Sequence, residues 1–251
     1  MARNRLLKIA SVVLALALWQ AATLLMGRSL LLVGPLDVVK ELGVQLAQAA
    51  FWKTVAFTLL RIALGFTLAL AAGVLLGALS YRFAAVETLL WPYIAVVKST
   101  PVASIIILIL IWLSARNLSV FVSFLIVLPV IYSNVLQGLK ATDPQLLEMA
   151  QVFRVGLWRR IRFIYLPQLR PYLVSACGTS IGMAWKSGTA AEVIGIPSGS
   201  IGERLYEAKV YLSSRELFAW TAVIIILSIL IEKLFIYLLD ASYRRLWRAT
   251  R

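Results

Sequence analysis

Residues 142–171, TDPQLLEMAQVFRVGLWRRIRFIYLPQLRP, form the longest polar interval in an otherwise apolar chain. This stretch holds five arginines but only two acidic residues. Asp143-Pro144 is typical of a helix start, because aspartate can accept hydrogen bonds from free amides and proline suits the first helical position. Pro167 and Pro171 are expected to interrupt the chain before the next apolar segment. The stretch therefore predicts a short helix on a basic loop that docks onto another protein.

The rest of the chain is too apolar for a soluble domain. Of its 251 residues, 61% are hydrophobic and 14% are charged, against about 45–50% and about 25% in soluble domains. Several apolar runs reach the roughly 20 residues that cross a bilayer. We therefore predict an all-α polytopic membrane protein that forms one domain over residues 1–251. The predicted transmembrane helices are about 6–26, 54–80, 86–113 with a break near 98–101, 118–139, 172–190 and 217–239.

The distribution of lysine and arginine predicts the orientation of these six spans. Summed over all loops and ends, the segments on the side of the two termini and of 142–171 hold 14 lysines and arginines, against 7 in the alternate segments. Because such an excess marks cytoplasmic segments, both termini and the 142–171 loop are expected in the cytoplasm. Orientation and contact with lipid headgroups explain the net charge of +14. Nucleic acid is not an expected partner, because no basic soluble module with interleaved aromatic residues is present.

The residue types exclude several kinds of chemistry. Because the chain has no histidine, it holds no Ser-His or Cys-His nucleophile pair and no His-ligated metal. Its single cysteine, Cys177, lies in an apolar run and is expected to be a small core residue. The pattern G-x-x-x-x-G-K-[ST], which binds nucleotide phosphates, is missing, since Lys186-Ser187 follows a tryptophan. We therefore expect no catalytic residue, no metal site and no P-loop nucleotide site in this chain.

Close helix packing is predicted on two spans. Small residues recur at every fourth position of the second span, and two glycines have the same spacing in the fifth. Such stripes let another helix approach closely in lipid. The residues predicted to mediate this packing are Gly65, Ala69, Gly73, Gly77, Gly178 and Gly182.

Two lysines near spans are candidates for a translocation path. A charge in hydrocarbon costs at least about 2.5–3.5 kcal/mol on insertion scales, so each must be paired, reach the interface or face water. Both lie beside small hydroxyl residues, and both a passage attractive to anions and structural pairing remain open. Glu192 is six residues from Lys186 and does not share its helix face, so pairing between them requires a helix break or another subunit. The candidate path residues are Lys98, Ser99, Thr100, Lys186, Ser187 and Glu192.

The 142–171 stretch resembles the cytoplasmic coupling loop of the permease subunits of bacterial ABC importers. That loop reads roughly Glu-Ala-Ala, three residues, Gly, and later Leu-Pro. Here Glu148-Met149-Ala150 matches the triplet, and Leu166-Pro167 closes the motif. Arg154 stands at the position of the family's glycine, with Gly156 two residues later. Either Gly156 provides the turn between two short helices, or the turn is built differently.

A second resemblance narrows the family. The sequence AEVIG at 191–195, followed by Ser200-Ile201-Gly202, is similar to the corresponding region of permeases for nitrate, sulfonates and taurine, a group that includes permeases for thiamine-precursor pyrimidines. The resemblance covers most of the chain from about residue 34. It implies the type I ABC importer permease fold with a coupling helix between the fourth and fifth spans. The solute is then a small anion or heterocycle.

The resemblance also implies the partners and the location. The expected assembly contains a second copy of the permease, two ABC ATPase subunits that bind ATP and Mg²⁺, and an extracytoplasmic solute-binding protein. It lies among the lipids of the bacterial cytoplasmic membrane. No cofactor is expected in this chain.

In this assembly, the helix at about 144–153 is expected to lie in a groove of the ATPase. Glu148 is the expected polar contact, whereas three apolar residues contact either the ATPase or the permease body. Arg159, Arg160 and Arg162 either touch the ATPase or act only as determinants of orientation. The residues assigned to coupling are Glu148, Met149, Ala150, Val152, Phe153, Arg154 and Gly156.

Two other classes of protein compete with this interpretation. A secondary transporter driven by an ion gradient typically shows repeated halves and acidic residues inside the membrane. The sequence shows no repeat of the first three spans, and few acidic residues lie near spans. An intramembrane enzyme needs a catalytic pair, which the spans lack.

Overall fold

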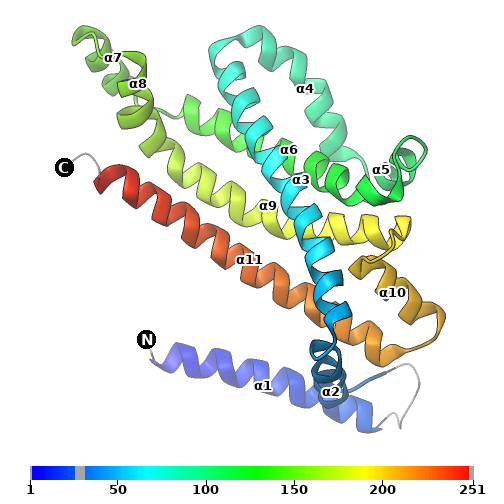
Figure 1. Ribbon diagram of the computed structural model, residues 1–251. Coiled ribbons are helices and arrows are strands. Elements are labelled where there is room, and N and C mark those ends of the chain that lie inside the picture. The colour runs from blue at the N-terminus through cyan, green and yellow to red at the C-terminus, as the bar shows by residue number, and fades with distance from the viewer. Residues whose placement is uncertain (1, 26–31, 249–251) are drawn as a thin grey trace.

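The computed structural model describes residues 2–25 and 32–248, and all regular structure in these ranges is helical (Figure 1). Short connections join most of the helices. In chain order the elements are α1 (Ala2–Leu25), α2 (Pro35–Leu46), α3 (Ala49–Arg82), α4 (Ala84–Ser99), α5 (Val102–Ile109), α6 (Ala115–Lys140), α7 (Pro144–Val152), α8 (Leu157–Arg160), the π-helical turn η1 (Ile161–Tyr165), α9 (Leu166–Gly195), α10 (Ile201–Val210) and α11 (Ser214–Arg248).

The core lies where α3, α6 and α9 pack together. Its buried side chains come from all three helices and include Ile62, Ile131 and Trp185. Helix α11 covers this core with large side chains such as Ile231 and Phe235. Helix α9 runs from the α7–α8 end of the molecule to α10 at the opposite end (Figure 1). Packing in the core therefore fixes the position of the α7–α8 end relative to the α10 end.

The stripe of small residues on α3 faces α6. Gly65, Ala69, Gly73 and Gly77 are all buried. A Cβ atom at Gly73 would lie 2.7 Å from Cγ2 of Ile131, and one at Gly77 would lie 2.7 Å from Cγ1 of Val135. Both separations are shorter than van der Waals contact, so glycine allows the two helices to approach this closely.

Substitution of Gly73 tests this packing. We expect Gly73→Val to destabilise the permease by about 1–3 kcal/mol, because the added methyl groups overlap α6. The loss should appear as a lower thermal transition and a smaller monodisperse fraction in detergent. Gly43→Val is the matched control, because nothing lies within 4 Å of a Cβ atom built at this helical glycine. Equal behaviour of the two variants would contradict the packing.

On the second predicted packing face, on α9, no helix in the described part of the chain comes as close as α6 comes to α3. The nearest neighbour of a Cβ atom at Gly178 is Cδ1 of Ile236 at 3.7 Å, and nothing lies within 4 Å of one at Gly182. The physical reason is that α11 meets this core with large side chains, which keep the two backbones apart. The glycine spacing alone did not indicate whether a neighbouring helix was near.

Three helices in the described ranges are long and apolar enough to cross a bilayer: α3, α6 and the part of α11 at Ser214–Ala241. Helices α4 and α5 meet the same criterion only as a pair, and the chain bends by 105° between them. The bend lies at Thr100 and Pro101, inside the predicted break. Thr100 is extended, as expected for a residue before proline. The structure thus describes a multi-pass protein, and the count of six spans stays a prediction.

The two prolines near the start of α9 do not interrupt the helices. Pro167 and Pro171 were expected to break the chain, yet α8, η1 and α9 follow one another without a gap. Pro167 closely follows the π-helical turn, and Pro171 lies inside α9. The wide π-helical turn before Pro167 changes the hydrogen-bond register, since the amide of Leu166 donates to the carbonyl of Ile161.

Candidate functional site

Helix α7 begins where the Asp-Pro pair predicted. The Oδ1 atom of Asp143 accepts a hydrogen bond from the amide of Gln145 at 2.9 Å, and Pro144 occupies the first helical position. The amide of Asp143 donates to Oε1 of Gln168 at 2.9 Å, which joins the start of α7 to α9. Ala150, the last residue of the Glu-Met-Ala triplet, is fully buried. Helix α7 therefore has one face against the molecule and one face free.

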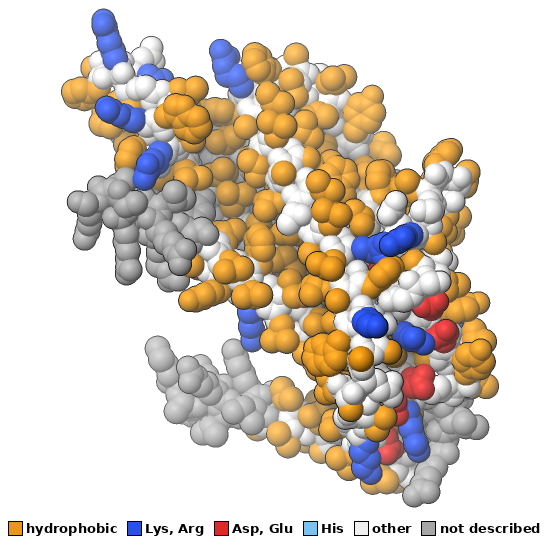
Figure 2. All heavy atoms as spheres, in the orientation of Figure 1, with side chains coloured by type: hydrophobic (Ala, Val, Ile, Leu, Met, Phe, Trp, Pro, Cys, Tyr) orange, Lys and Arg blue, Asp and Glu red, His pale blue; other side chains and the backbone are white. Residues whose placement is uncertain are grey.

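The free face of the α7–α8 region is apolar. Five large side chains on it are exposed, among them Phe153 at 74% and Trp158 at 83%, and Glu148 is exposed beside them. Basic side chains surround this end of the molecule in Figure 2. We call the five residues the docking patch: Met149, Val152, Phe153, Leu157 and Trp158.

The exposure of these side chains bears on a question that the sequence left open, namely whether they contact the permease body. Met149, Val152 and Phe153 point away from the body of the chain, because each is about half or more exposed. Leu157 and Trp158 were not among the predicted coupling residues. They lie four and five residues after Phe153, and only the turn after α7 shows that they are exposed at the same end of the molecule.

The turn between α7 and α8 is built on Arg154 itself. Its φ angle is +52°, in the left-handed region. The amide of Val155 donates to the carbonyl of Ala150 at 2.8 Å, and the amide of Arg154 donates to that of Gln151 at 3.0 Å. These two bonds define a Schellman helix end, which usually has glycine at the left-handed position. Gly156, with φ at −63°, instead precedes α8 as its N-cap, so it does not replace the family's glycine.

The π-helical turn η1 joins this loop to the body of the chain. The rings of Tyr165 and Tyr81 meet edge to face, with centroids 5.9 Å apart. Burial, together with a hydrogen bond with Tyr81, raises the pKa of Tyr165 to about 12. The ring and the hydroxyl group of Tyr165 thus connect η1 to α3 through Tyr81.

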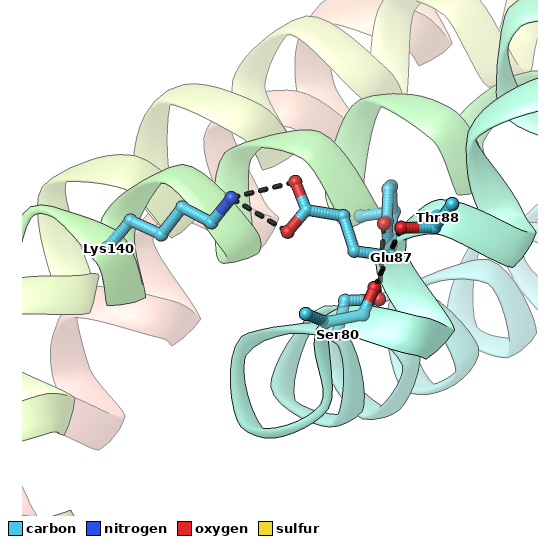
Figure 3. A network of polar contacts seen from close by, with 6 residues as sticks. Ser80, Glu87, Thr88 and Lys140 are labelled. Atoms are coloured by element: carbon cyan, nitrogen blue, oxygen red, sulfur yellow. Dashed lines mark hydrogen bonds and ion pairs between the residues drawn. The ribbon is translucent and has the colours of Figure 1, made fainter.

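Lys98 lies in a groove between α4 and α6 with a volume of about 410 Å³. Its Nζ atom donates to Oγ of Ser133 at 2.8 Å. Beside it, Nζ of Lys140 donates to both carboxylate oxygens of Glu87, at 2.7 and 2.8 Å (Figure 3). Trp91 also lines the groove. The groove thus combines an apolar wall with one lysine that is held by a hydroxyl group and one that is held by a carboxylate.

The other candidate path residues are arranged differently. Ser99 and Thr100 donate their hydroxyl groups to the carbonyl of Val96, at 3.1 and 2.7 Å, and so satisfy the end of α4 at the break. Lys186 is exposed on α9. Ser187 is buried and donates to the carbonyl of Met183 at 2.8 Å. The hydroxyl group of Ser187 thus turns back onto its own helix in this conformation, and its role in a path stays a prediction.

Glu192 was also assigned to the path, but it is fully buried. Its Oε2 atom accepts hydrogen bonds from Oγ1 of Thr58 at 2.8 Å and from the amide of Gly202 at 3.4 Å. Oγ1 of Thr58 in turn accepts from the amide of Ile201 at 2.9 Å. Glu192 and Thr58 therefore hold the first amides of α10, which lack partners within the helix. We call this set of four residues the α10 bracket; pairing of Glu192 with Lys186 has no part in it.

A family model matches residues 65–248 and is described as the binding-protein-dependent transport system inner membrane component. The chain belongs to this family. It is thus a permease subunit of an ABC importer in the inner membrane, and ATP hydrolysis belongs to a separate subunit. The family also implies an ATPase and a binding protein as partners of this permease.

Similar proteins include permeases for sulfonates, taurine and nitrate, the group that the sequence resembles. It is 26% identical over 190 residues to the putative aliphatic sulfonates transport permease protein SsuC of Bacillus subtilis, with 75% of this chain and 67% of that protein covered. It is 26% identical over 220 residues to the taurine transport system permease protein TauC of Escherichia coli, with 85% of this chain and 80% of that protein covered. It is 25% identical over 204 residues to the nitrate import permease protein NrtB of Synechococcus elongatus, with 77% of this chain and 72% of that protein covered.

The fold of the permease is also similar to that of a solved structure, an amino acid ABC transporter with histidines. The TM-score is 0.55 at 21% sequence identity, and 77% of this chain and 94% of that chain are covered. This similarity supports the permease fold. Membership of this family excludes the two competing interpretations, a secondary transporter and an intramembrane enzyme.

Proposed function

We propose that two copies of this permease form a translocation path for a small anion or heterocycle, and that each copy binds an ABC ATPase through the docking patch. Each copy crosses the membrane six times, with both termini and α7 in the cytoplasm. The ATPases bind ATP and Mg²⁺, and this chain binds no cofactor. A solute-binding protein docks on the opposite side, and lipid covers the outer apolar surface. The exposed docking patch on a short helix outside the long apolar helices is the observation that carries this proposal.

The arrangement of the patch fits an ATPase groove. Aromatic residues at the centre of an interface contribute most of its binding energy, and Phe153 and Trp158 are the two aromatic residues of the patch, both highly exposed. Glu148 lies beside them as the polar contact, while Ala150 lies against the permease. Arg154 and Gly156 shape the turn rather than the contact surface.

Closure of the two ATPases on ATP would bring the two α7 helices together. A ligand shifts a conformational equilibrium only by its differential affinity for the two states, and here ATP-bound ATPases favour the state in which the α7 helices are close. The motion reaches α9 because α8, η1 and α9 are continuous. Helix α9 leads to α10 at the opposite end, where the binding protein releases its solute.

The groove at Lys98 supports an anionic solute. An ammonium group has three donors, and Ser133 accepts only one of them. The side chain of Lys98 is exposed, so its other donors are accessible from the groove. The relatives are named for sulfonates, taurine and nitrate, which all carry an anionic group. We place Lys98 in the path on these grounds, with Ser99 and Thr100 shaping the helix end beside it, and Lys186 as a second exposed lysine.

Neutralising Lys98 tests the solute class. We expect Lys98→Gln to lower ATP-dependent uptake of the transported anion about tenfold, because a hydrogen bond from a charged donor contributes roughly 1.5–3 kcal/mol. Lys98→Arg should retain most of the uptake. The measurement uses proteoliposomes with the ATPase, the binding protein and a panel of nitrate, taurine, an alkyl sulfonate and a pyrimidine.

The control for Lys98 is Lys140→Gln, which removes the other lysine of the groove and its ion pair with Glu87. This exposed pair is expected to contribute little. Unchanged uptake in Lys98→Gln would remove this residue from the path. Uptake of the pyrimidine alone would leave the permease as proposed and change the solute class to a heterocycle.

A further inference from the structure

The α7–α8 turn contains an arginine that binds backbone carbonyls rather than a partner. The Nε atom of Arg160 donates to the carbonyl of Val155 at 2.8 Å, and Nη2 donates to the carbonyl of Ala150 at 3.2 Å. The side chain is partly buried, whereas its neighbour Arg159 is exposed. We propose that Arg160 is a positioning residue that clamps the coupling helix to α8, so that motion of the docking patch reaches α9. This inference rests on the proposed docking of α7 on an ATPase.

Of the two carbonyls that Arg160 binds, that of Ala150 lies in the last turn of α7 and that of Val155 lies just after the helix. The last carbonyls of a helix have no partner within the helix, and a basic side chain there is favourable because the helix C-terminus carries partial negative charge. The carbonyl of Ala150 also accepts from the amide of Val155. Arg160 therefore binds the two residues that close the Schellman turn, one on each side of Arg154.

The unusual residue at the left-handed position explains why a clamp is useful. Arg154 has a Cβ atom, and a left-handed conformation is unfavourable for such residues relative to glycine. The turn is therefore less stable than one with glycine at the same position. A guanidinium group supplies several donors in a rigid plane, so one side chain can bind both carbonyls and hold the turn in this shape.

The clamp lies between the docking patch and α9, where it can transmit motion of the patch to α9. Phe153 of the docking patch directly precedes Arg154, and Arg160 lies at the end of α8, which continues into η1 and α9. Without the clamp, force applied at Phe153 would bend the turn. With the clamp, the last turn of α7 and the first turn of α8 move together with α9.

The test uses the complete complex with its ATPase, in detergent or nanodiscs, and compares Arg160→Ala with Arg159→Ala. Hydrogen exchange is measured for residues 150–156 and for α9, before and after addition of Mg²⁺ and the non-hydrolysable nucleotide AMP-PNP. In Arg160→Ala we expect the ATPase to stay bound and exchange at 150–156 to rise about threefold to tenfold, as expected for the loss of about one hydrogen bond. The response of α9 to AMP-PNP should fall at least about twofold, whereas Arg159→Ala should behave as the native protein.

A second pair of variants separates transmission from simple stability. In the double variant Arg154→Gly with Arg160→Ala, glycine adopts the left-handed conformation readily, so both the protection at 150–156 and the response of α9 should return. Arg160→Lys should fall between the native protein and Arg160→Ala, because an ammonium group lacks the planar set of donors. It also serves as the test variant if Arg160→Ala does not fold.

The results distinguish this inference from the proposed function. If the Arg160 variants match Arg159→Ala in local exchange and in the response of α9, Arg160 is not a positioning residue. If the response of α9 falls but glycine at 154 does not restore it, the clamp does not act through the turn and the inference is overturned. If the ATPase binds normally when Phe153 itself is changed to aspartate, the proposed docking fails instead.

Discussion

Phe153→Asp is expected to remove the ATPase from the purified complex, with at least about a thirtyfold loss of affinity. The estimate corresponds to roughly 2 kcal/mol, the lower bound for a central aromatic residue of an interface. The side chain is 74% exposed in the isolated chain, so the substitution leaves the permease core intact. Co-purification of the tagged permease with its ATPase, followed by titration of the ATPase onto immobilised permease, measures the effect.

Tyr211→Asp is the matched control, because Tyr211 is 79% exposed and follows α10, at the end opposite the docking patch (Figure 1). It should leave ATPase binding unchanged. Glu148→Lys reverses the charge of the expected polar contact and should also lose the ATPase or uncouple transport. Normal co-purification and normal uptake in Glu148→Lys would remove Glu148 from the interface.

Glu192→Leu is expected to destabilise the permease strongly through the α10 bracket. Leucine removes the acceptor for the Thr58 hydroxyl group and for the amide of Gly202, and each buried donor without a partner costs about 1–3 kcal/mol. Glu192→Gln should cost less than about 1 kcal/mol, because one amide oxygen can accept both bonds that Oε2 accepts now. Thermal unfolding in detergent and the monodisperse fraction measure the difference.

A backbone substitution tests the same bracket independently. A Cβ atom at Gly202 would overlap the backbone of Glu192, so Gly202→Ala should also destabilise the permease by at least about 1–3 kcal/mol. If leucine at 192 is tolerated as well as glutamine, the bracket does not hold α10. Loss of uptake in Glu192→Gln without loss of stability would return Glu192 to the translocation path.

Much of the loop could be predicted from local sequence. Asp143-Pro144 marks the start of α7, because the carboxylate and the proline act within three residues of each other. Thr100-Pro101 marks a break, since proline restricts the residue before it. In both cases the physical cause lies between neighbours in the chain, and so the sequence contains it in full.

Contacts between distant residues could not be predicted in this way. Gly73 and Gly182 occur in the same kind of stripe, but only Gly73 meets a neighbouring helix. Glu192 appears on the sequence as a charge near a span, although Thr58, its partner, is 134 positions away. Arg159 and Arg160 are adjacent and chemically identical, yet one is exposed and the other binds the end of α7.

The sequence by itself determined that this protein is a helical membrane protein, that a basic loop separates two of its apolar segments and that this loop contains the coupling motif. These properties depend on composition and on short-range patterns, which need no knowledge of neighbours in space. Only the tertiary structure decided which apolar residues of the loop remain exposed, that Arg154 forms the left-handed turn, and that Glu192 is a buried acceptor. The exposure of the loop and the burial of Glu192 depend on which distant parts of the chain come together in space. The turn is local, but the residue types at 154 and 156 left two ways of building it, and only the backbone conformation decided between them.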